Sequence, residues 1–502
     1  MVAGAVLVGV AGCAAGPAYH RPDPQLPGRY ASTIDATAAG TATVVDLSAW
    51  WHALNDAELD SLIDRAVAAN PDLQVALARV QAARTFEIGV IGRTLPDAAA
   101  TGGAGRGTGS DLSRGRAASD LVSADNTRGL NSINELGGFD SVWELDVFGK
   151  YRREIQAARY DAAAALAARN AVLVSVIGDV ARAYVELRGL QMRAAVLHAT
   201  IKAVSESQRI ADIRFRRGIT NELDSVLAAR ELATLEASVA PVEAQISAAE
   251  FTIATLVGRY PEDLTAELAA PALVPVVPAV AGPGTPVDLL RRRSDVQQAE
   301  WELAGATARI GIATADLFPH LGVIGSIGYQ RQGLGETPVV GQHIWSLGPA
   351  AFWPLLDFGA LDAAVEAADL ETRARLVNYR RTIQNAVRDV DTATSALNAE
   401  RERLAKLSDA LLASQRAVTL ANERYVRGLT DFLNVIDAER QEYAIEVEYT
   451  SAQVGLADEF IALYKSLGGG WESYQNLPPS YVPKPAVVAA FRRILLRDDP
   501  LN

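Results

Sequence analysis

Two stretches of the chain, residues 148–258 and 358–468, are two copies of one segment at a constant offset of 210 with no gap. Few residues between the copies are identical, but the landmarks at both ends and in the middle coincide. They are Phe148-Gly149 with Phe358-Gly359, Arg217-Gly218 with Arg427-Gly428, and Gly258 with Gly468. An internal repeat decides the architecture before any single motif does. We therefore predict a duplicated long helical hairpin.

Apolar residues in each copy recur at helical spacing. In the second copy they recur every seven residues without a miss, at Ile383, Val390, Leu397, Leu404, Leu411, Val418 and Tyr425. A seven-residue repeat sustained this far indicates helices that pack along their length and supercoil. We predict long helices at 149–217 and 359–427, each roughly 100 Å long at the usual helical rise. Shorter return helices are predicted at 222–257 and 432–467.

Four other segments alternate with a period of two and are predicted as strands. Their approximate ranges are 97–107, 138–148, 320–330 and 343–357. The first is rich in glycine and has the weakest pattern. Alternation with aromatic residues is typical of strands that face lipid on one side, but a half-buried sheet of a soluble protein has the same pattern. The alternation alone leaves both interpretations open.

The strand pairs occupy matching places in the two halves. Each half reads helix, strand, strand, long helix, return helix, which gives a first structural repeat at 48–270 and a second at 287–470. A proline-rich linker, 271–286, joins them. Residues 471–502 form a C-terminal tail to which the sequence assigns no function.

The single cysteine follows a short apolar run. Residues 1–12 are too few to span a bilayer and have the character of a signal-peptide core, although no basic residue precedes them, as in a signal peptide that lacks its start. Val10-Ala11-Gly12-Cys13 resembles a bacterial lipobox, so Cys13 is the expected lipidation site at the head of an extended arm, 13–47. The alternative is an incidental cysteine. No other stretch reads as a transmembrane helix, so any membrane span is expected to consist of strands.

Composition argues against several function classes. The net charge of −13 disfavours a nucleic-acid partner, because binding phosphates requires a basic surface. Five histidines, two methionines and one cysteine leave little for metal or thiol chemistry. No catalytic triad spacing, metal-ligand cluster or glycine-rich phosphate loop stands out. We therefore expect no catalytic residues, no metal and no cofactor other than a covalent lipid on Cys13.

Four strands cannot close a barrel, and a bilayer does not tolerate an open sheet edge. About eight strands is the practical minimum. If these strands enter a membrane, several chains have to contribute to one barrel. A cyclic trimer would provide twelve strands, continued by a bundle of long helices that forms a tunnel.

Several short motifs occur along the chain in a characteristic order. They are Cys13, Trp50-Trp51, Asn70-Pro71-Asp72-Leu73, Trp143-Glu144-Leu145-Asp146-Val147-Phe148-Gly149, Arg292-Arg293-Ser294-Asp295-Val296, Leu317-Phe318-Pro319 and both Arg-Gly turns. In this order and spacing the chain resembles the TolC-like outer-membrane efflux factors, in particular their lipid-anchored NodT/OprM-like branch. The resemblance covers nearly all of 13–470.

The resemblance implies a fold and a function. The fold is mainly α with a membrane β-barrel part, and three chains form a 12-stranded barrel continued by a long α-helical barrel in the periplasm. The protein would be the outer-membrane channel of a tripartite efflux pump, anchored by lipid in the outer membrane. It would conduct substrates passively from a periplasmic adaptor and an inner-membrane transporter of the resistance-nodulation-division type.

The resemblance also implies a periplasmic gate at Tyr425, Asp224 and Asp437, with Asn434 where some relatives have a second acid. Thr430 stands where some relatives have an arginine, so an identical salt bridge is not expected. Each gate residue has a simpler interpretation, because acids favour helix starts and Tyr425 continues the apolar stripe. The turns at Arg217, Gly218, Arg427 and Gly428 would contact the adaptor.

Two other functions are weighed against the channel. A periplasmic adaptor or a structural coiled-coil lipoprotein would also have long hairpins and a lipid anchor. Adaptors usually have one hairpin within β-rich domains, whereas this chain has two hairpins and four candidate strands. An enzyme is the third alternative and has no motif in its favour.

Overall fold

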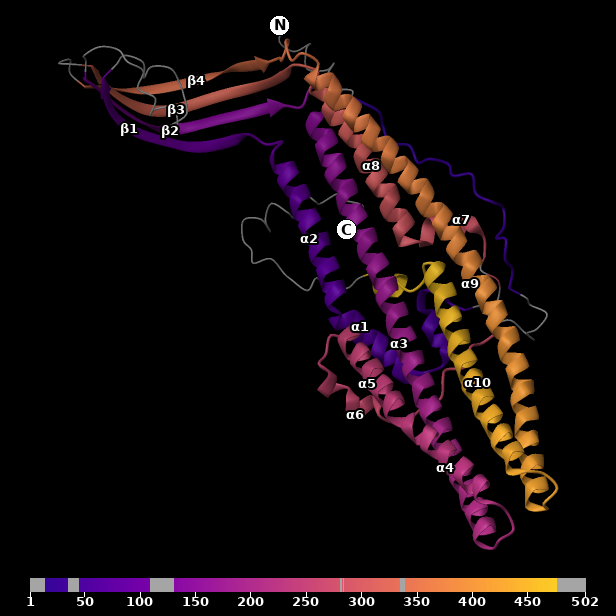
Figure 1. Ribbon diagram of the computed structural model, residues 1–502. Coiled ribbons are helices and arrows are strands. Elements are labelled where there is room, and N and C mark those ends of the chain that lie inside the picture. Colours follow the sequence, from indigo (N-terminus) through magenta and orange to yellow (C-terminus); the bar gives the residue numbers. More distant parts are fainter. Residues whose placement is uncertain are drawn as a thin grey trace.

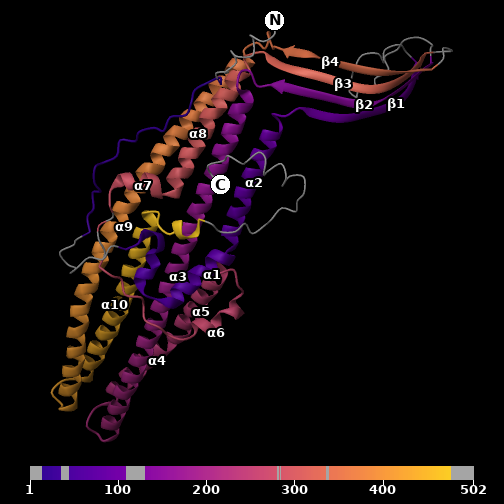
Figure 2. The ribbon, with the colours of Figure 1, turned by 180° about the vertical axis from the view of Figure 1, so that it is seen from behind.

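The computed structural model describes residues 14–34, 45–108, 131–279, 282, 284–334 and 339–475. The predicted signal peptide 1–12, Cys13, part of the arm and most of the tail 471–502 lie outside the described residues. A curved four-stranded sheet stands at one end of a long bundle of helices, and two helical hairpins end side by side at the other (Figures 1 and 2).

The elements follow the order expected from the duplication. The first half contains η2 (Leu47–Leu54), α1 (Ala57–Ala69), α2 (Pro71–Gly92), β1 (Asp97–Thr108), β2 (Asn131–Leu145), α3 (Lys150–Arg216), α4 (Glu222–Ala237), α5 (Val239–Leu256), η4 (Pro261–Asp263) and α6 (Thr265–Leu268). The second half contains α7 (Pro286–Arg292), α8 (Ser294–Ala315), β3 (His320–Leu334), β4 (Val340–Phe352), α9 (Ala360–Val426), α10 (Phe432–Ser466) and η5 (Glu472–Tyr474).

The glycines that mark the repeat have the same backbone in both copies. Gly149 and Gly359 precede the long helices with φ of 80° and 86°. The turn and C-terminal glycines also have positive φ, at Gly218, Gly428, Gly258 and Gly468. Glycine is the residue that adopts this conformation at little cost. The long helices α3 and α9 both contain 67 residues, so the predicted duplication extends to the geometry of the fold.

All four strands form one antiparallel sheet in the order β1-β2-β3-β4. The two strand pairs, one from each half, join through β2 and β3. Phe139 lies opposite Ile327, and Ile327 lies opposite Trp345, so one face presents an exposed apolar row. On the other face Asp140, Ser326 and Ser346 lie opposite one another. The two faces therefore differ as the alternation predicts.

The strands differ from their predicted ranges at several ends. β2 begins at Asn131 and ends at Leu145, not 138–148, while β3 extends to Leu334. Their polar ends belong to the sheet because Asn131 pairs with Thr108 and Ser132 with Leu334. β4 is Val340–Phe352 and not 343–357. Pro354, which cannot donate to a ladder, follows its end.

The first return segment is two helices and not the single helix predicted at 222–257. α4 ends at Ala237 and α5 begins at Val239, with Ser238 between them. Pro241 lies in the first turn of α5, where proline is tolerated, whereas within a continuous helix it would remove a hydrogen bond. The corresponding residue of the second copy is Ser451, and α10 runs without a break from Phe432 to Ser466.

The expectation that no stretch beyond residues 1–12 has the length and composition of a transmembrane helix is wrong. Among the described helices, α3 contains an 18-residue window with a mean hydropathy of 1.5, which by length and composition could cross a membrane. However, 61% of that window is buried inside the protein. The window is apolar because α3 is the central helix, packed against α2, α8 and α10.

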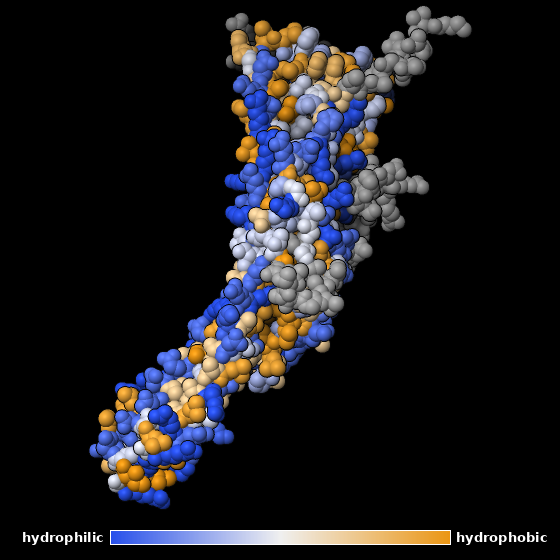
Figure 3. All heavy atoms as spheres, turned by 90° about the vertical axis from the view of Figure 1, so that its right-hand side faces the viewer, coloured by the Kyte–Doolittle hydropathy of each residue, from blue (hydrophilic) through white to orange (hydrophobic). Residues whose placement is uncertain are grey.

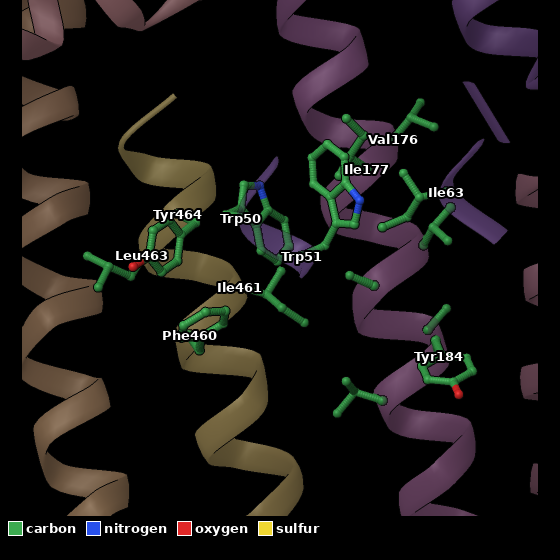
Figure 4. Close-up of a cluster of buried hydrophobic side chains, with 14 of the residues drawn as sticks. Trp50, Trp51, Ile63, Val176, Ile177, Tyr184, Phe460, Ile461, Leu463 and Tyr464 are labelled. Carbon is green, nitrogen blue, oxygen red and sulfur yellow. The ribbon is translucent and has the colours of Figure 1, made fainter. Parts of the chain in front are cut away.

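The main core lies in the middle of the bundle, where η2 of the first half packs against α10 of the second. Trp50 and Trp51 of η2 are buried between α3 and α10 (Figure 4). Trp50 stacks on Tyr464 with ring centroids 5.9 Å apart, and Trp51 stacks on Tyr474. This core therefore joins the beginning of the first half to the end of the second.

The N-terminal arm runs along the outside of the second half, beside α8 and α9 (Figure 1). Arg21 pairs with Glu300 of α8 at 2.7 Å, and Asn398 of α9 donates to the carbonyl oxygen of Thr33 at 2.9 Å. At its start, the amide of Ala15 donates to the carbonyl oxygen of Phe148. The residues that follow Cys13 thus lie where the sheet meets the helices.

Candidate functional site at the hairpin tips

Both hairpins turn at exposed tips. α3 ends at Arg216 and α9 at Val426. The predicted tip residues lie in the turns that follow, and all four are exposed: Arg217, Gly218, Arg427 and Gly428. Ile219 and Leu429, next to the glycines, are also exposed, so the tip surface mixes apolar and charged residues (Figure 3).

A small apolar cluster joins the two hairpins just above the tips. We call it the tip cluster, and it contains Ala211, Ala228, Tyr425, Phe432, Val435 and Ile436. α3 and α4 of the first hairpin each contribute an alanine, while α9 and α10 contribute the larger side chains. The second hairpin therefore docks its aromatic residues on small residues of the first.

Tyr425 connects this cluster to a carboxylate. Its ring lies 5.0 Å from that of Phe432, and its hydroxyl donates to Oδ2 of Asp224 on α4 at 3.3 Å. Burial, followed by the charge of Asp224, raises the pKa of Tyr425 to about 12. The hydroxyl therefore remains a protonated donor at any ordinary pH.

Arg214 of α3 lies against the same tyrosine. Its guanidinium carbon is 4.7 Å from the centroid of the Tyr425 ring, within the range of a cation–π contact. Its Nη1 donates to the carbonyl oxygen of Val426 at 3.2 Å. Arg214 thus contacts both the ring and the backbone of the second hairpin.

Further from the tips, polar contacts bridge the hairpins a second time. Arg440 of α10 pairs with Glu231 of α4, its Nε lying 2.7 Å from Oε2. Ser207 of α3 donates to Oε1 of Glu439 of α10 at 2.6 Å. Ser207, Glu231 and Glu439 are all buried. Since a buried carboxylate needs a partner, both contacts favour the docked arrangement of the hairpins.

Burial raises the pKa of Glu439, and the hydrogen bond from Ser207 offsets part of the rise. The neighbouring charges of Glu442 and Glu231 raise it further. The bond between Ser207 and Glu439 is therefore sensitive to protonation of Glu439, which the docked hairpins enclose.

The structure brings together only some of the predicted gate residues. Tyr425 and Asp224 are in contact. Asn434 instead donates from Nδ2 to Oγ1 of Thr430 in its own hairpin at 2.7 Å. Asp437 is exposed, and its charge adds to the effect of Glu231 in raising the pKa of Arg440.

Sequence reasoning did not single out Arg214, Ser207, Glu231 or Glu439 as site residues. One signal was available for Glu439. Phe432, Val435, Ile436 and Glu439 follow the spacing of one helix face, and Glu439 is the single charged residue on that buried stripe. For Arg214 no pattern in the sequence indicates which of the many exposed or half-exposed arginines near the turns contacts the other hairpin.

Within the part of the chain that the structure describes, no group of three or more His, Cys, Asp or Glu side chains is arranged to hold a metal ion. Three carboxylates near the tips, Asp224, Glu231 and Glu439, accept hydrogen bonds from Tyr425, Arg440 and Ser207 respectively. The arrangement is suited to fastening two hairpins together, and each fastening contact can be released without breaking a covalent bond.

A protein-family model described as "Outer membrane efflux protein" matches residues 62–259 and 285–469. Curated relatives include nodulation protein T of Rhizobium leguminosarum bv. trifolii, with 28% identity over 92% of this chain and 95% of the relative. Outer membrane protein OprJ of Pseudomonas aeruginosa has 29% identity over 93% of this chain and 94% of the relative.

Solved structures give the same result. The outer-membrane channel OprN has 34% identity and a TM-score of 0.80, covering 92% of this chain and all of that chain. The open state of the Neisseria gonorrhoeae MtrE outer membrane channel has 26% identity and a TM-score of 0.74, covering 91% of this chain and 99% of that chain.

Proposed function

The chain belongs to the outer membrane efflux protein family, and from this membership we propose how it works as the outer-membrane channel of a tripartite efflux pump. Three copies form one passive conduit, which receives substrates from a periplasmic adaptor and an inner-membrane transporter of the resistance-nodulation-division type. The protein has no catalytic activity of its own. The family assignment favours this channel over the periplasmic adaptor.

The observation that supports the trimer is the open four-stranded sheet. β1 and β4 are its outer strands, and each leaves a row of backbone donors and acceptors that lipid cannot satisfy. Pairing β4 of one copy with β1 of the next would remove every edge. Three copies would give twelve strands, with the row of Phe139, Ile327 and Trp345 toward lipid and Asp140, Ser326 and Ser346 toward the lumen.

A trimer of this kind makes a first prediction. Isolated outer membranes are expected to contain a species that migrates as a trimer in SDS without heating and as a monomer after boiling, because a closed barrel resists the detergent. Boiled and unboiled portions of one sample serve as each other's control. A monomer in both lanes, or fractionation with the inner membrane, would rule out the trimeric channel.

We also propose that Cys13 carries the covalent lipid. The support is the position of the residues that follow it. Arg153 of α3 donates to the carbonyl oxygens of Ala15 and Gly16 at 3.0 and 2.9 Å. A Cβ at Gly149 would lie 2.6 Å from Cα of Ala14. The arm is thus held at the junction of sheet and helices, where an acyl chain would reach the inner leaflet of the outer membrane.

The hairpin tips form the proposed gate. Tyr425 and Asp224 hold the second hairpin against the first, while Asp437 and Asn434 on the exposed side of α10 face the axis of the trimer. Three copies of Asp437 around a narrow axis would repel one another and attract cations. The turns at Arg217-Gly218 and Arg427-Gly428 are the proposed contacts for the adaptor.

The second prediction concerns that ring of carboxylates. Asp437→Ala is expected to raise conductance or to weaken cation preference in planar bilayers, because it removes three like charges from one constriction. Glu222→Ala is the matched control, since Glu222 is an exposed acid at the tip of the first hairpin. A properly assembled Asp437→Ala trimer with unchanged conductance and ion preference would remove Asp437 from the gate.

A further inference from the structure

We infer that Arg214 of the first hairpin is the positioning residue that holds Tyr425, and with it the second hairpin, in the closed arrangement. The inference rests on the proposed gate and adds to it the cation that Thr430 does not supply. An arginine at 430 would lie on the second hairpin itself. Arg214 lies on α3 of the first hairpin and contacts Tyr425 and Val426 of the second.

The first support is the backbone at the end of α9. In the turn that follows, the amide of Gly428 donates to the carbonyl oxygen of Tyr425, and the amide of Leu429 to that of Arg424. These bonds satisfy two of the last carbonyls of the helix. The carbonyl of Val426 instead accepts from Nη1 of Arg214. A cation at this position also opposes the partial negative charge of the helix C-terminus.

The second support is the ring of Tyr425. Only 3% of the residue is exposed, and the guanidinium of Arg214 lies over its ring. The hydrogen bond from the Tyr425 hydroxyl to Asp224 is 3.3 Å long, whereas O–H···O bonds are usually about 2.7–2.8 Å. The Tyr425–Asp224 contact is therefore weak by geometry, and the guanidinium of Arg214 adds a second polar contact to the same side chain.

The third support comes from the duplication. Arg214-Phe215 in the first copy corresponds to Arg424-Tyr425 in the second. The two arginines have different surroundings, because Arg424 is exposed whereas Arg214 is partly buried against the other hairpin. Both copies thus have an arginine near the turn, but it is Arg214 that makes the described contacts with Tyr425 and Val426 of the other hairpin. Arg424 provides a control that the chain itself supplies.

The test compares Arg214→Ala, Arg214→Lys and Arg424→Ala as complete trimers in planar bilayers. A cation–π contact is worth about 2- to 30-fold in an equilibrium constant. Arg214→Ala is expected to raise the open fraction by a factor in that range. Arg214→Lys keeps the charge but loses the flat guanidinium and should recover part of the closure. Arg424→Ala should conduct like the wild type.

A double variant separates positioning from general loosening. If Arg214 acts through Tyr425, adding Arg214→Ala to Tyr425→Ala should change conductance little further, whereas independent effects would add. If Arg214→Ala does not assemble, the same comparison is made with Arg214→Lys, whose partial opening is then the expected result.

The outcomes distinguish the inference from the gate it rests on. Opening by Tyr425→Ala together with wild-type conductance for Arg214→Ala would overturn the role of Arg214 and leave the gate intact. Equal opening by Arg214→Ala and Arg424→Ala would also overturn it, since the effect would then be one of charge alone. If Tyr425→Ala, Asp437→Ala and Arg214→Ala trimers all stay closed, the proposed gate itself is wrong.

Discussion

Replacing Trp50 with alanine is expected to lower the free energy of unfolding by about 3–5 kcal/mol per chain, the usual effect of removing a fully buried large aromatic side chain. Only 1% of Trp50 is exposed. Its indole stacks on Tyr464 and meets the ring edges of Trp51 and Phe460 at centroid distances of 5.8 and 6.2 Å (Figure 4). Phe460 and Tyr464 lie on the long helix α10, so the space cannot easily close.

The loss of stability should extend beyond the surroundings of Trp50, because Trp50 joins η2, near the start of the first half, to α10, at the end of the second. The measurement is chemical unfolding in detergent, together with the temperature at which the SDS-resistant trimer is lost. Tyr260→Ala is the control, because Tyr260 is a large aromatic residue that is 79% exposed. If Trp50→Ala and Tyr260→Ala unfold alike, the core described here does not stabilise the assembled protein.

The overall architecture could be predicted from the sequence because its determinants are local or repeated. Gly149, Gly218 and Gly258 recur at a fixed offset as Gly359, Gly428 and Gly468. A glycine that ends or begins a helix has the same conformational role in both copies. The seven-residue stripe of α9 likewise predicts a partner along its length, whatever that partner is.

Two kinds of feature could not be predicted. The ends of β2 and β3 depend on partners elsewhere in the chain, since the polar residues from Asn131 onward are held by backbone pairing with β1 and β3, which no side-chain pattern reports. The break at Ser238 depends on one proline, Pro241. Because proline is also tolerated in the first turn of a helix, its presence alone does not show where one helix ends and the next begins.

Most of the candidate site belongs to the first kind, because its contacts depend on partners elsewhere in the chain. Tyr425 and Asp224, which the resemblance assigned to one gate, are in contact. Ser207–Glu439 and Glu231–Arg440 join residues more than two hundred positions apart, and their partners follow only from the way the two hairpins dock. Propensity and periodicity describe one helix at a time, so they cannot identify contacts between hairpins.

Tyr425→Ala is expected to open the channel strongly, whereas Tyr425→Phe should open it only slightly. The stripe of α9 explains Tyr425 by packing, and the proposed gate explains it by the hydroxyl bond to Asp224. Alanine removes both the buried ring and the surface on which Arg214 lies, a loss of about 3 kcal/mol or roughly a hundredfold per chain. Phenylalanine removes only a long hydrogen bond, worth about 0.5 kcal/mol.

The measurement is single-channel conductance of each assembled variant, read together with the entry of a large antibiotic into whole cells. Phe215→Ala is the matched control, because Phe215 occupies the position of the first repeat that corresponds to Tyr425, and 40% of it is exposed. Equal opening by Tyr425→Phe and Tyr425→Ala would assign the latch to the hydroxyl and Asp224. Strong opening by Tyr425→Ala alone would assign it to the ring, its place in the tip cluster and the cation of Arg214 that covers it.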